Sequence, residues 1–227
     1  MDVNKGPLEK AQEHIREEKL GGKIATRLGN GLAPLEPGET DTVIIAGMGG
    51  DLICKILKAK PEFLIEGKEF ILQPQSEWFK IRRLLKEYRY QIEKEWFLKE
   101  DGKYYVIIKA EPAWTQPQRL KHQQPSIHEY IKEISDTQVN QAVSEKDMES
   151  IYEQYGKYLI ETKNPVLKEY LEKEITKKES IAAELKQSIK EIESEELSGK
   201  ERGNIAKRQR RYQEIQKEIR DMRKAIG

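Results

Sequence analysis

The stretch DTVIIAGMGG, residues 41–50, decides the fold of the N-terminal half of the chain. Residues 41–46 form a nearly continuous apolar run between turn signals, which is typical of a strand buried on both faces. The run ends in a glycine-rich turn, and apolar residues at helical spacing follow at Leu52, Ile53, Ile56 and Leu57. Strand, glycine turn and helix in this order predict one unit of a parallel sheet.

The segments on either side of this stretch repeat the alternation of helix and strand. We expect a helix over 7–20, strands over 23–28 and 70–72, a helix capped by Ser76, and two strands over 90–98 and 104–110 that turn at Asp101-Gly102. Strands separated by helices imply a parallel sheet wrapped in helices, here with an antiparallel strand at its end. Residues 1–112 are therefore predicted to form a domain of the α/β class.

The remaining residues have a different composition. Residues 113–146 carry prolines and glutamines but little apolar content, which indicates a polar linker or insertion, with a short helix near residues 128–134. Residues 147–227 contain two runs of apolar residues at heptad spacing, interrupted at Ser198-Gly199. Two such helices joined by a short turn predict an antiparallel helical hairpin, a coiled coil, with homodimerisation through the same seam as the alternative.

Charge is unevenly distributed along the chain. Charged residues make up 36% of it and apolar residues 37%, whereas ordinary globular domains have about 25% and about 45–50%. The net charge is only +1, yet residues 200–227 contain ten basic and four acidic residues. A basic C-terminal segment of this kind suits a polyanionic partner.

Composition also excludes several classes of protein. No apolar run approaches the roughly 20 residues that a membrane span needs, and no secretory leader opens the chain. The single cysteine, Cys54, excludes an internal disulfide and suits a reducing, cytoplasmic location. The three histidines are too scattered to suggest a metal site. We therefore expect neither a membrane nor a secreted nor a metal-binding protein.

Two glycine turns, at residues 29–31 and 47–50, follow predicted strands that lead into helices. Ligands bind at the carboxyl ends of parallel strands, where glycine permits close backbone approach and the start of a helix offers free N–H groups. The alternative is that both are tight turns that only need a positive φ. Asp2, just before the first helix, either binds ribose hydroxyls or caps that helix.

Five short motifs within residues 2–112 resemble the TrmK family, bacterial S-adenosylmethionine-dependent methyltransferases that modify adenine 22 of tRNA. They are DVNKGPL at 2–8, RLGNGL at 27–32, IAGMGG at 45–50, LQPQ at 72–75 and EDGKYY at 100–105. YGKYL at 155–159, followed by Asn164-Pro165, is similar to the start of the family's C-terminal coiled coil.

The resemblance implies an incomplete Rossmann-like methyltransferase sheet followed by the helical hairpin. The family begins with a strand and an Asp-rich glycine turn of the type D-I-G-S-D-H-A, which cradles the methionine part of the cofactor, and this sequence starts after that turn. An aspartate proposed as the family's base lies in the same turn. No catalytic residue is therefore assigned.

The resemblance also implies roles for residues that are present. Asp2 would hold the ribose of S-adenosylmethionine and Asn30 would lie beside its adenine ring, in a cofactor site completed by Gly29 and Gly31. The substrate adenine would lie against a second set of residues, Gly47, Met48, Gly49, Gly50, Gln73 and Pro74. The excess of basic residues in the last helix, rather than the resemblance, predicts contacts with tRNA phosphates at Lys207, Arg208, Arg210 and Arg211. The alternative for these is a solvated coiled-coil face with Glu–Lys pairs.

Together these observations predict a cytoplasmic tRNA adenine-N(1) methyltransferase that uses S-adenosylmethionine, as a monomer or as a homodimer through the C-terminal helices. Inactivity of this chain through the missing cofactor turn is one expected outcome. Two alternatives stay open, a non-catalytic RNA-binding protein and a structural coiled-coil protein that carries an α/β fragment.

Overall fold

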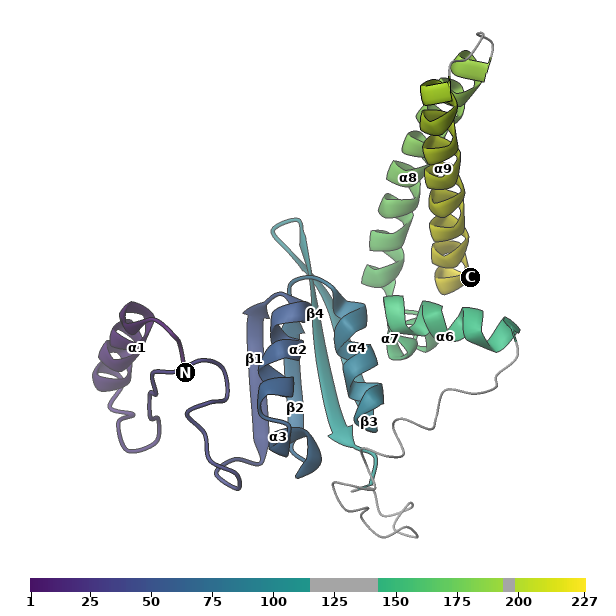
Figure 1. Ribbon diagram of the computed structural model, residues 1–227. Helices are drawn as coiled ribbons and strands as arrows, with labels where there is room; N and C mark the ends of the chain where they lie inside the picture. The colour runs from purple at the N-terminus through teal and green to yellow at the C-terminus, as the bar shows by residue number, and fades with distance from the viewer. Residues whose placement is uncertain (115–142, 194–198) are drawn as a thin grey trace. The chain divides into compact units, whose positions relative to one another are not determined.

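The computed structural model describes residues 1–114, 143–193 and 199–227 (Figure 1). It divides into two compact units. We call the first the sheet unit; it contains Met1–Trp96 and the described residues from Tyr105 onward. The second, the helical unit, contains Phe97–Tyr104 and all the helices from Val143 onward. The predicted linker over 113–146, with its short helix near residues 128–134, lies almost entirely outside the described residues.

The sheet unit is built on four strands, β1 (Thr42–Met48), β2 (Glu69–Pro74), β3 (Tyr90–Glu100) and β4 (Lys103–Pro112). Their order is β1-β2-β4-β3, with β1 parallel to β2 and β2 antiparallel to β4. The predicted α/β class is confirmed. The expected position of the antiparallel strand at the end of the sheet is wrong, because β4 pairs with β2 and the tight turn then leaves β3 at the edge.

That turn has the geometry that its sequence predicts. Asp101 and Gly102 both have positive φ, 46° and 76°, and two central residues with positive φ are typical of a type I′ hairpin turn. The hairpin around Asp101-Gly102 is therefore confirmed.

Helices α2 (Gly50–Ala59), α3 (Glu62–Ile65) and α4 (Trp78–Glu87) follow the strands, and α2 lies beside α4 over the sheet (Figure 1). Val43 and Ile45 of β1 are buried, whereas Ile44 between them is 67% exposed. The expectation that this strand is buried on both faces is therefore wrong. Successive side chains of a strand point to opposite faces, and in β1 only the face with Val43 and Ile45 is covered.

Two further local predictions are corrected. Ser76 does not cap α4, because the N-cap residue is Glu77, in the left-handed region with φ 53°, and no side chain caps this helix. The predicted strand over 23–28 is reduced to an isolated bridge between Asp2 and Leu28, because a strand persists only where a neighbour pairs with it along its length. The first helix is confirmed as α1 (Lys5–Glu17).

The helical unit contains α6 (Val143–Tyr155), α7 (Lys157–Glu161), α8 (Pro165–Glu193) and α9 (Gly199–Ile226). α8 and α9 run antiparallel and pack along each other (Figure 1). Most apolar positions of the predicted seam whose burial is described are buried, namely Leu171, Ile175, Ala182 and Ile189 on α8 and Ile205, Ile215, Ile219 and Met222 on α9. The antiparallel helical hairpin is thus confirmed. None of the described helices is long and apolar enough to cross a membrane.

The tip of the β3–β4 hairpin is part of the helical unit. The rings of Phe97 and Tyr104 both contact the ring of Tyr170 on α8, with centroids 5.5 and 5.0 Å away. Beside them, the carboxylate of Glu169 pairs with Lys99 at 2.5 Å and with Lys173 at 2.6 Å. An aromatic cluster and a shared carboxylate therefore fix the tip against α8.

Candidate functional site

The carboxyl ends of β1 and β2 lie side by side and carry the two sequence motifs predicted to contact the substrate base. Met48 pairs with Pro74 in the parallel register, after an irregularity at Gly47. The N–H of Gly47 donates to Oε1 of Gln73 at 2.7 Å, and the N–H of Gln75 donates to the carbonyl of Met48 at 2.9 Å. We call residues 47–50 and 73–77 the strand-end rim. The structure thus brings the glycine turn and Gln73-Pro74 together.

Glycine is required at two positions of the rim for different reasons. Gly47 has φ +78°, a conformation that other residues rarely adopt, and the space where a Cβ would lie is open. At Gly50 a Cβ would lie 2.6 Å from the carbonyl oxygen of Ser76 and 2.7 Å from that of Glu77. Gly47 therefore shapes an open turn, whereas Gly50 lets the start of α2 approach the neighbouring backbone.

The N–H groups at the start of α2 already have partners. Gly50 donates to the carbonyl of Ser76 at 3.0 Å, and the N–H of Asp51 donates to a carboxylate oxygen of Glu77 at 3.2 Å. The expectation that this helix start offers free N–H groups to a ligand is wrong for these two residues. The carboxylate of Glu77 also opposes an anionic ligand at this position.

A network of charges fixes the outer side of the rim. Lys80 contacts Asp51 at 2.9 Å and Glu77 at 2.6 Å, and Lys55 contacts Asp51 at 2.8 Å. Hydrogen bonds from Lys55 and Lys80 lower the pKa of Asp51 to about 2, and the hydrogen bond from Lys80 lowers the pKa of Glu77. Both carboxylates are therefore ionised at neutral pH and tie α2 to α4.

One of the two hydrogen-bonding groups of the Gln73 side chain has no partner among the described residues. Its Oε1 is used by Gly47, but its Nε2 is buried and donates to no described residue. A buried amide donor without an acceptor is unusual and costs free energy. Gln73 therefore has a buried donor without an acceptor next to the open turn at Gly47.

The predicted cofactor residues form a second group. The N–H of Gly29 donates to the carbonyl of Asp2 at 2.9 Å, and Asp2 is bridged to Leu28. Oδ1 of Asp2 accepts from the N–H of Asn4 at 2.8 Å, just ahead of α1. The structure therefore brings Asp2 together with the glycine turn at 29–31. One oxygen of its carboxylate accepts a hydrogen bond ahead of the helix, but the capping alternative is wrong, because the N-cap residue of α1 is Asn4 and no side chain caps this helix.

The glycine turn at 29–31 packs against α2. Asn30 is exposed, and Gly31, with φ +56°, lies so close to Ile56 that a Cβ would be 2.6 Å from its Cγ2. Because α2 also begins at the strand-end rim, both predicted groups adjoin the same helix, one at its start and one along its side.

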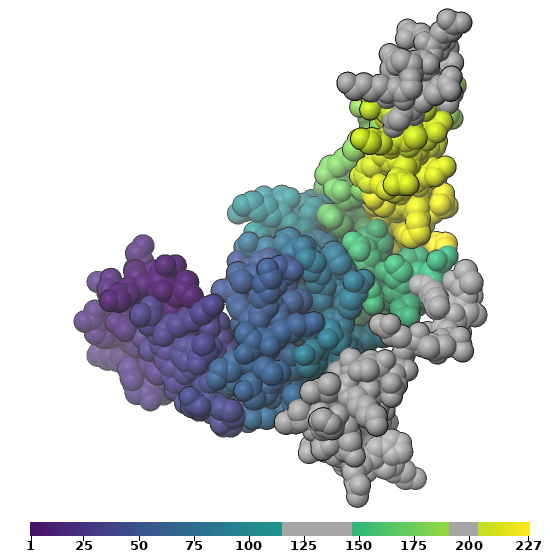
Figure 2. Space-filling view, in the orientation of Figure 1, coloured from purple at the N-terminus to yellow at the C-terminus, as the bar shows by residue number. Residues whose placement is uncertain are grey.

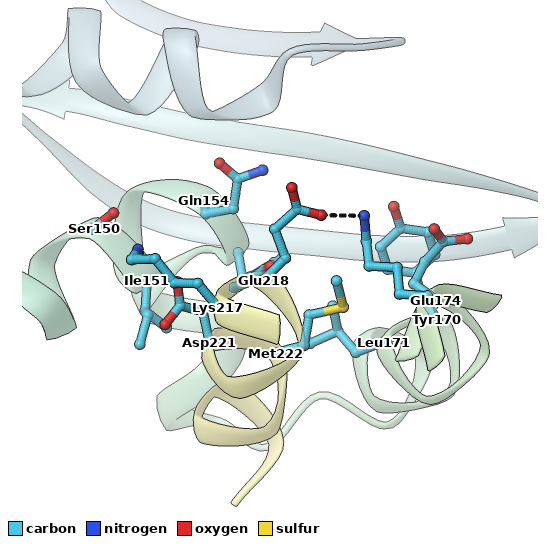
Figure 3. A pocket seen from close by; sticks show the side chains of 12 residues that line it. Ser150, Ile151, Gln154, Tyr170, Leu171, Glu174, Lys217, Glu218, Asp221 and Met222 are labelled. Atoms are coloured by element: carbon cyan, nitrogen blue, oxygen red, sulfur yellow. Dashed lines mark hydrogen bonds and ion pairs between the residues drawn. The ribbon is translucent and has the colours of Figure 1, made fainter. Parts of the chain in front are cut away.

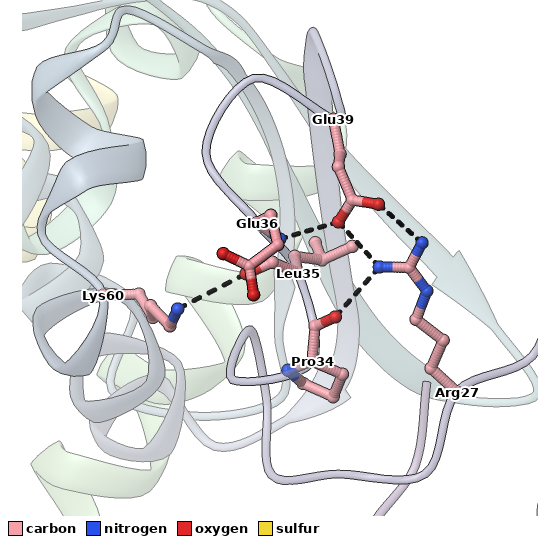
Figure 4. Close-up of polar contacts among 6 residues, drawn as sticks. All are labelled: Arg27, Pro34, Leu35, Glu36, Glu39 and Lys60. Carbon is pink, nitrogen blue, oxygen red and sulfur yellow. Dashed lines mark hydrogen bonds and ion pairs between the residues drawn. The ribbon is translucent and has the colours of Figure 1, made fainter.

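Sequence reasoning missed an ion pair beside this turn (Figure 4). Arg27 binds both carboxylate oxygens of Glu39 at 2.7 Å and donates to the carbonyl of Pro34 at 2.9 Å. The hydrogen bond from Arg27 is the main reason that the pKa of Glu39 falls to about 2. No local pattern connects two residues twelve positions apart in a loop, so the sequence carried no signal for this pair.

The four predicted RNA-binding residues on α9 differ in their surroundings. Lys207 and Arg210 are exposed, whereas Arg208 is half-buried. Arg211 pairs with Glu214 at 3.1 Å and with Glu218 at 3.3 Å. Much of α9 lies on the visible surface in Figure 2. Lys207 and Arg210 are thus the members of this set that are best placed to meet a polyanion.

The helical unit also contains a partly open cavity of about 410 Å³ between α6, α8 and α9 (Figure 3). Lysines and carboxylates in its wall pair with each other, Lys178 with Glu218 and Lys217 with Asp221. Burial raises the pKa of the Tyr155 phenol, which also lines the cavity. A third carboxylate of the wall, Glu174, pairs with Lys177 outside the lining, so each charge of the wall has a partner of opposite sign. Across the described ranges, no group of three or more metal-ligating side chains comes together.

Comparisons with known proteins identify the family of this chain. The family model described as "TrmK: tRNA (adenine(22)-N(1))-methyltransferase" matches residues 1–149. The tRNA (adenine(22)-N(1))-methyltransferase of Bacillus subtilis is 32% identical over 171 residues, which cover 61% of this chain and 71% of that protein.

Solved structures show the same fold. The crystal structure of the Bacillus subtilis m1A22 tRNA methyltransferase TrmK has a TM-score of 0.67 and 24% identity, over 99% of this chain and 80% of that one. M. capricolum TrmK, in complex with the natural cofactor product S-adenosyl-homocysteine, has a TM-score of 0.62 and 22% identity, over 99% and 78%. The match of the family model and the identity to the curated relative show that the chain belongs to the TrmK family of tRNA (adenine(22)-N(1))-methyltransferases.

Proposed function

We propose that this chain transfers a methyl group from S-adenosylmethionine to N1 of adenine 22 in tRNA. The observation that carries the proposal is the strand-end rim, where Gln73 of one strand fixes the open turn at Gly47 of the next. Membership of the TrmK family supports both the reaction and the substrate.

The residues of the second group fit the adenosine part of S-adenosylmethionine. Oδ1 of Asp2 is bonded to Asn4, while the side chain stays partly exposed, so that a ribose hydroxyl has a carboxylate acceptor. Leu28 is 51% exposed and Val3 58%, which offers apolar surface to a purine face next to Asn30. We assign Asp2, Gly29, Asn30 and Gly31 to the cofactor site on these grounds.

The reaction requires orientation more than acid–base catalysis. S-adenosylmethionine supplies an electrophilic methyl group on its sulfonium, and N1 of adenine is a neutral nucleophile near pH 7, so that holding the two in line lowers the barrier. N1 lies on the Watson–Crick edge, which is accessible only when the base is unpaired or flipped out.

The strand-end rim supplies the surface for such a base. Backbone without a Cβ at Gly47 allows the purine to approach closely, and Met48 offers a soft apolar contact. The Nε2 donor of Gln73 is buried and has no acceptor among the described residues, so a rotation of this side chain toward the rim would bring it to a ring acceptor of the base other than N1. We assign Gly47, Met48, Gly49, Gly50, Gln73 and Pro74 to the site of the target adenine.

The helical unit is proposed to hold the tRNA backbone. Lys207, Arg208, Arg210 and Arg211 lie on α9, and the exposed pair Lys207 and Arg210 is expected to contribute most. We further propose that the chain is a monomer, since the apolar seam of α8 and α9 is filled within one chain, and that it acts in the cytoplasm, where tRNA is processed.

Two measurements test the proposed function. Binding of S-adenosylmethionine by the full chain in isothermal titration would support the proposed cofactor site, whereas no binding would support the inactive alternative. Transfer of a labelled methyl group is expected to occur to a tRNA with adenine at position 22 and not to the same tRNA with guanine there. A chain that retains tRNA in a filter-binding assay but neither binds S-adenosylmethionine nor methylates would instead support the non-catalytic RNA-binding alternative.

A further inference from the structure

The Arg27–Glu39 pair closes a loop around the glycine turn of the proposed cofactor site (Figure 4). Both nitrogen atoms at the end of the guanidinium reach the carboxylate, and one of them also binds the carbonyl of Pro34. Glu39 in addition accepts from the N–H of Glu36 at 2.6 Å. Two charged side chains thus connect the strand-like segment before the turn with the far end of the loop. We call these four contacts the clasp.

The segment within the clasp is tightly packed around Asn30. A Cβ at Gly29 would lie 2.2 Å from Cγ of Pro34, and the N–H of Ala33 donates to the carbonyl of Asn30 at 3.1 Å. The clasp binds Pro34 itself, so the same residue touches Gly29 on one side and Arg27 on the other. Any opening of the clasp therefore changes the turn that carries Asn30.

A second contact supports the outer part of this loop. Nζ of Lys60, at the end of α2, donates to the carbonyl of Leu35 at 3.3 Å. This bond fixes the loop to the helix but leaves the ends of the loop unconnected. Arg27 and Glu39 join the two ends of the loop. Because the Arg–carboxylate pair is bidentate, it holds these ends in a defined geometry.

We propose that Arg27 and Glu39 are positioning residues for cofactor binding, which hold the turn at residues 29–31 in the shape that receives the adenine ring of S-adenosylmethionine. This inference rests on the proposed function. Neither side chain belongs to the residues assigned to the cofactor site, so each is proposed to act through the turn. A preformed turn binds more tightly because the ligand does not have to order it.

The test uses variants of the full chain and two ligands. Glu39→Gln removes the charge of the carboxylate, and Arg27→Lys removes the bidentate geometry. Binding of S-adenosylmethionine and of 5′-methylthioadenosine, which keeps the adenosine part but lacks the amino-acid part, is measured by isothermal titration. The matched control is Glu87→Gln, which breaks the exposed Lys58–Glu87 pair between α2 and α4.

We expect both clasp variants to weaken binding of the two ligands by a similar factor, about 1.5- to fivefold, the usual range for removal of a surface ion pair. In methylation assays KM for S-adenosylmethionine should rise by the same factor while kcat is unchanged. Glu87→Gln should alter neither, although it removes an ion pair of the same kind. A role in stability alone would lower the melting temperature of the clasp variants without changing either Kd.

Three results would overturn the inference. Unchanged affinities in folded Glu39→Gln and Arg27→Lys variants would remove the positioning role and leave the proposed function intact. Weaker binding of S-adenosylmethionine with unchanged binding of 5′-methylthioadenosine would place the effect away from the adenine ring. Failure of the unmodified chain to bind either ligand would reject the cofactor site itself, and the inference with it.

Discussion

Oε1 of Gln73 accepts a hydrogen bond from the N–H of Gly47 at 2.7 Å, which joins two residues that are 26 positions apart in the sequence. The bond fixes the peptide of Gly47, which has a φ of +78° and no atom within 4 Å of the position that a Cβ would take. A single side chain therefore sets the shape of the rim proposed to receive the target base.

Substitutions of Gln73 should distinguish the contributions that its two hydrogen-bonding groups make to activity. Gln73→Glu keeps an acceptor for Gly47 but removes the Nε2 donor, whereas Gln73→Ala removes both. We expect kcat/KM for tRNA methylation to fall about three- to tenfold for each hydrogen bond removed, and hence further in Gln73→Ala than in Gln73→Glu. The control is Gln75→Ala, because the exposed Gln75 contributes only its backbone to the rim. Equal activity in all three variants would contradict the proposed site.

Gly50 is the position of the rim where a side chain is least tolerated. In Gly50→Ala the new Cβ would meet two backbone oxygens, those of Ser76 and Glu77, at 2.6 and 2.7 Å, and backbone yields less readily than a flexible side chain. We expect the free energy of unfolding to fall by about 1–3 kcal/mol, measured by urea denaturation.

A second glycine provides the control for this substitution. Gly6 lies in α1, and nothing is within 4 Å of its Cβ position. Gly6→Ala should leave stability unchanged or raise it by about 0.4–1 kcal/mol, since alanine restricts the unfolded chain. If both variants were equally stable, the close approach at Gly50 would not constrain the rim.

Glu169 should give the helical unit a measurable dependence on pH. Hydrogen bonds from Lys173 and then Lys99 lower its pKa to about 2, well below the value of an unfolded glutamate. A lowered pKa in the folded state contributes stability that is present above about pH 4.5 and is lost as the pH falls toward 2. In Glu169→Gln the decline in melting temperature between pH 4.5 and 2, followed by circular dichroism, should therefore be shallower.

Glu172 serves as the comparison for Glu169. It lies on the same helix and pairs only weakly with Lys168, at 3.9 Å, so Glu172→Gln should keep the unmodified pH profile. Identical profiles for both variants would mean that the shared carboxylate does not hold the hairpin tip against α8.

The parts of the structure that were predicted correctly rest on local patterns. The apolar run at 41–46, the Asp101-Gly102 turn and the heptad seam each specify an element through neighbours a few residues away. The exposed Ile44 was not foreseen, because an apolar run does not reveal which face a helix will cover. The Gln73–Gly47 and Arg27–Glu39 contacts join residues 26 and 12 positions apart, and their partners become neighbours only when the sheet and loop have formed.

The basic residues of α9 allow the sequence prediction and the structure to be compared directly. The sequence alone gives no reason to rank the four predicted cations as phosphate ligands. In the structure, Arg211 is already paired with Glu214 and Glu218. Lys207 and Arg210 are exposed and three residues apart, so they lie on one face of the helix. We therefore expect Lys207→Gln and Arg210→Gln to weaken tRNA binding more than Arg211→Gln does.

The salt dependence of tRNA binding distinguishes phosphate binding from other effects of these substitutions. Removal of one phosphate-binding cation should reduce the slope of log Kobs against log salt concentration by about 0.7–0.9, so the double variant Lys207→Gln/Arg210→Gln should show about twice that reduction in filter-binding titrations. Lys177→Gln on α8 is the control, since Lys177 is exposed and paired with Glu174 at 2.6 Å, and its slope should match the unmodified chain. A double variant with an unchanged slope would mean that the tRNA backbone does not lie along this face of α9.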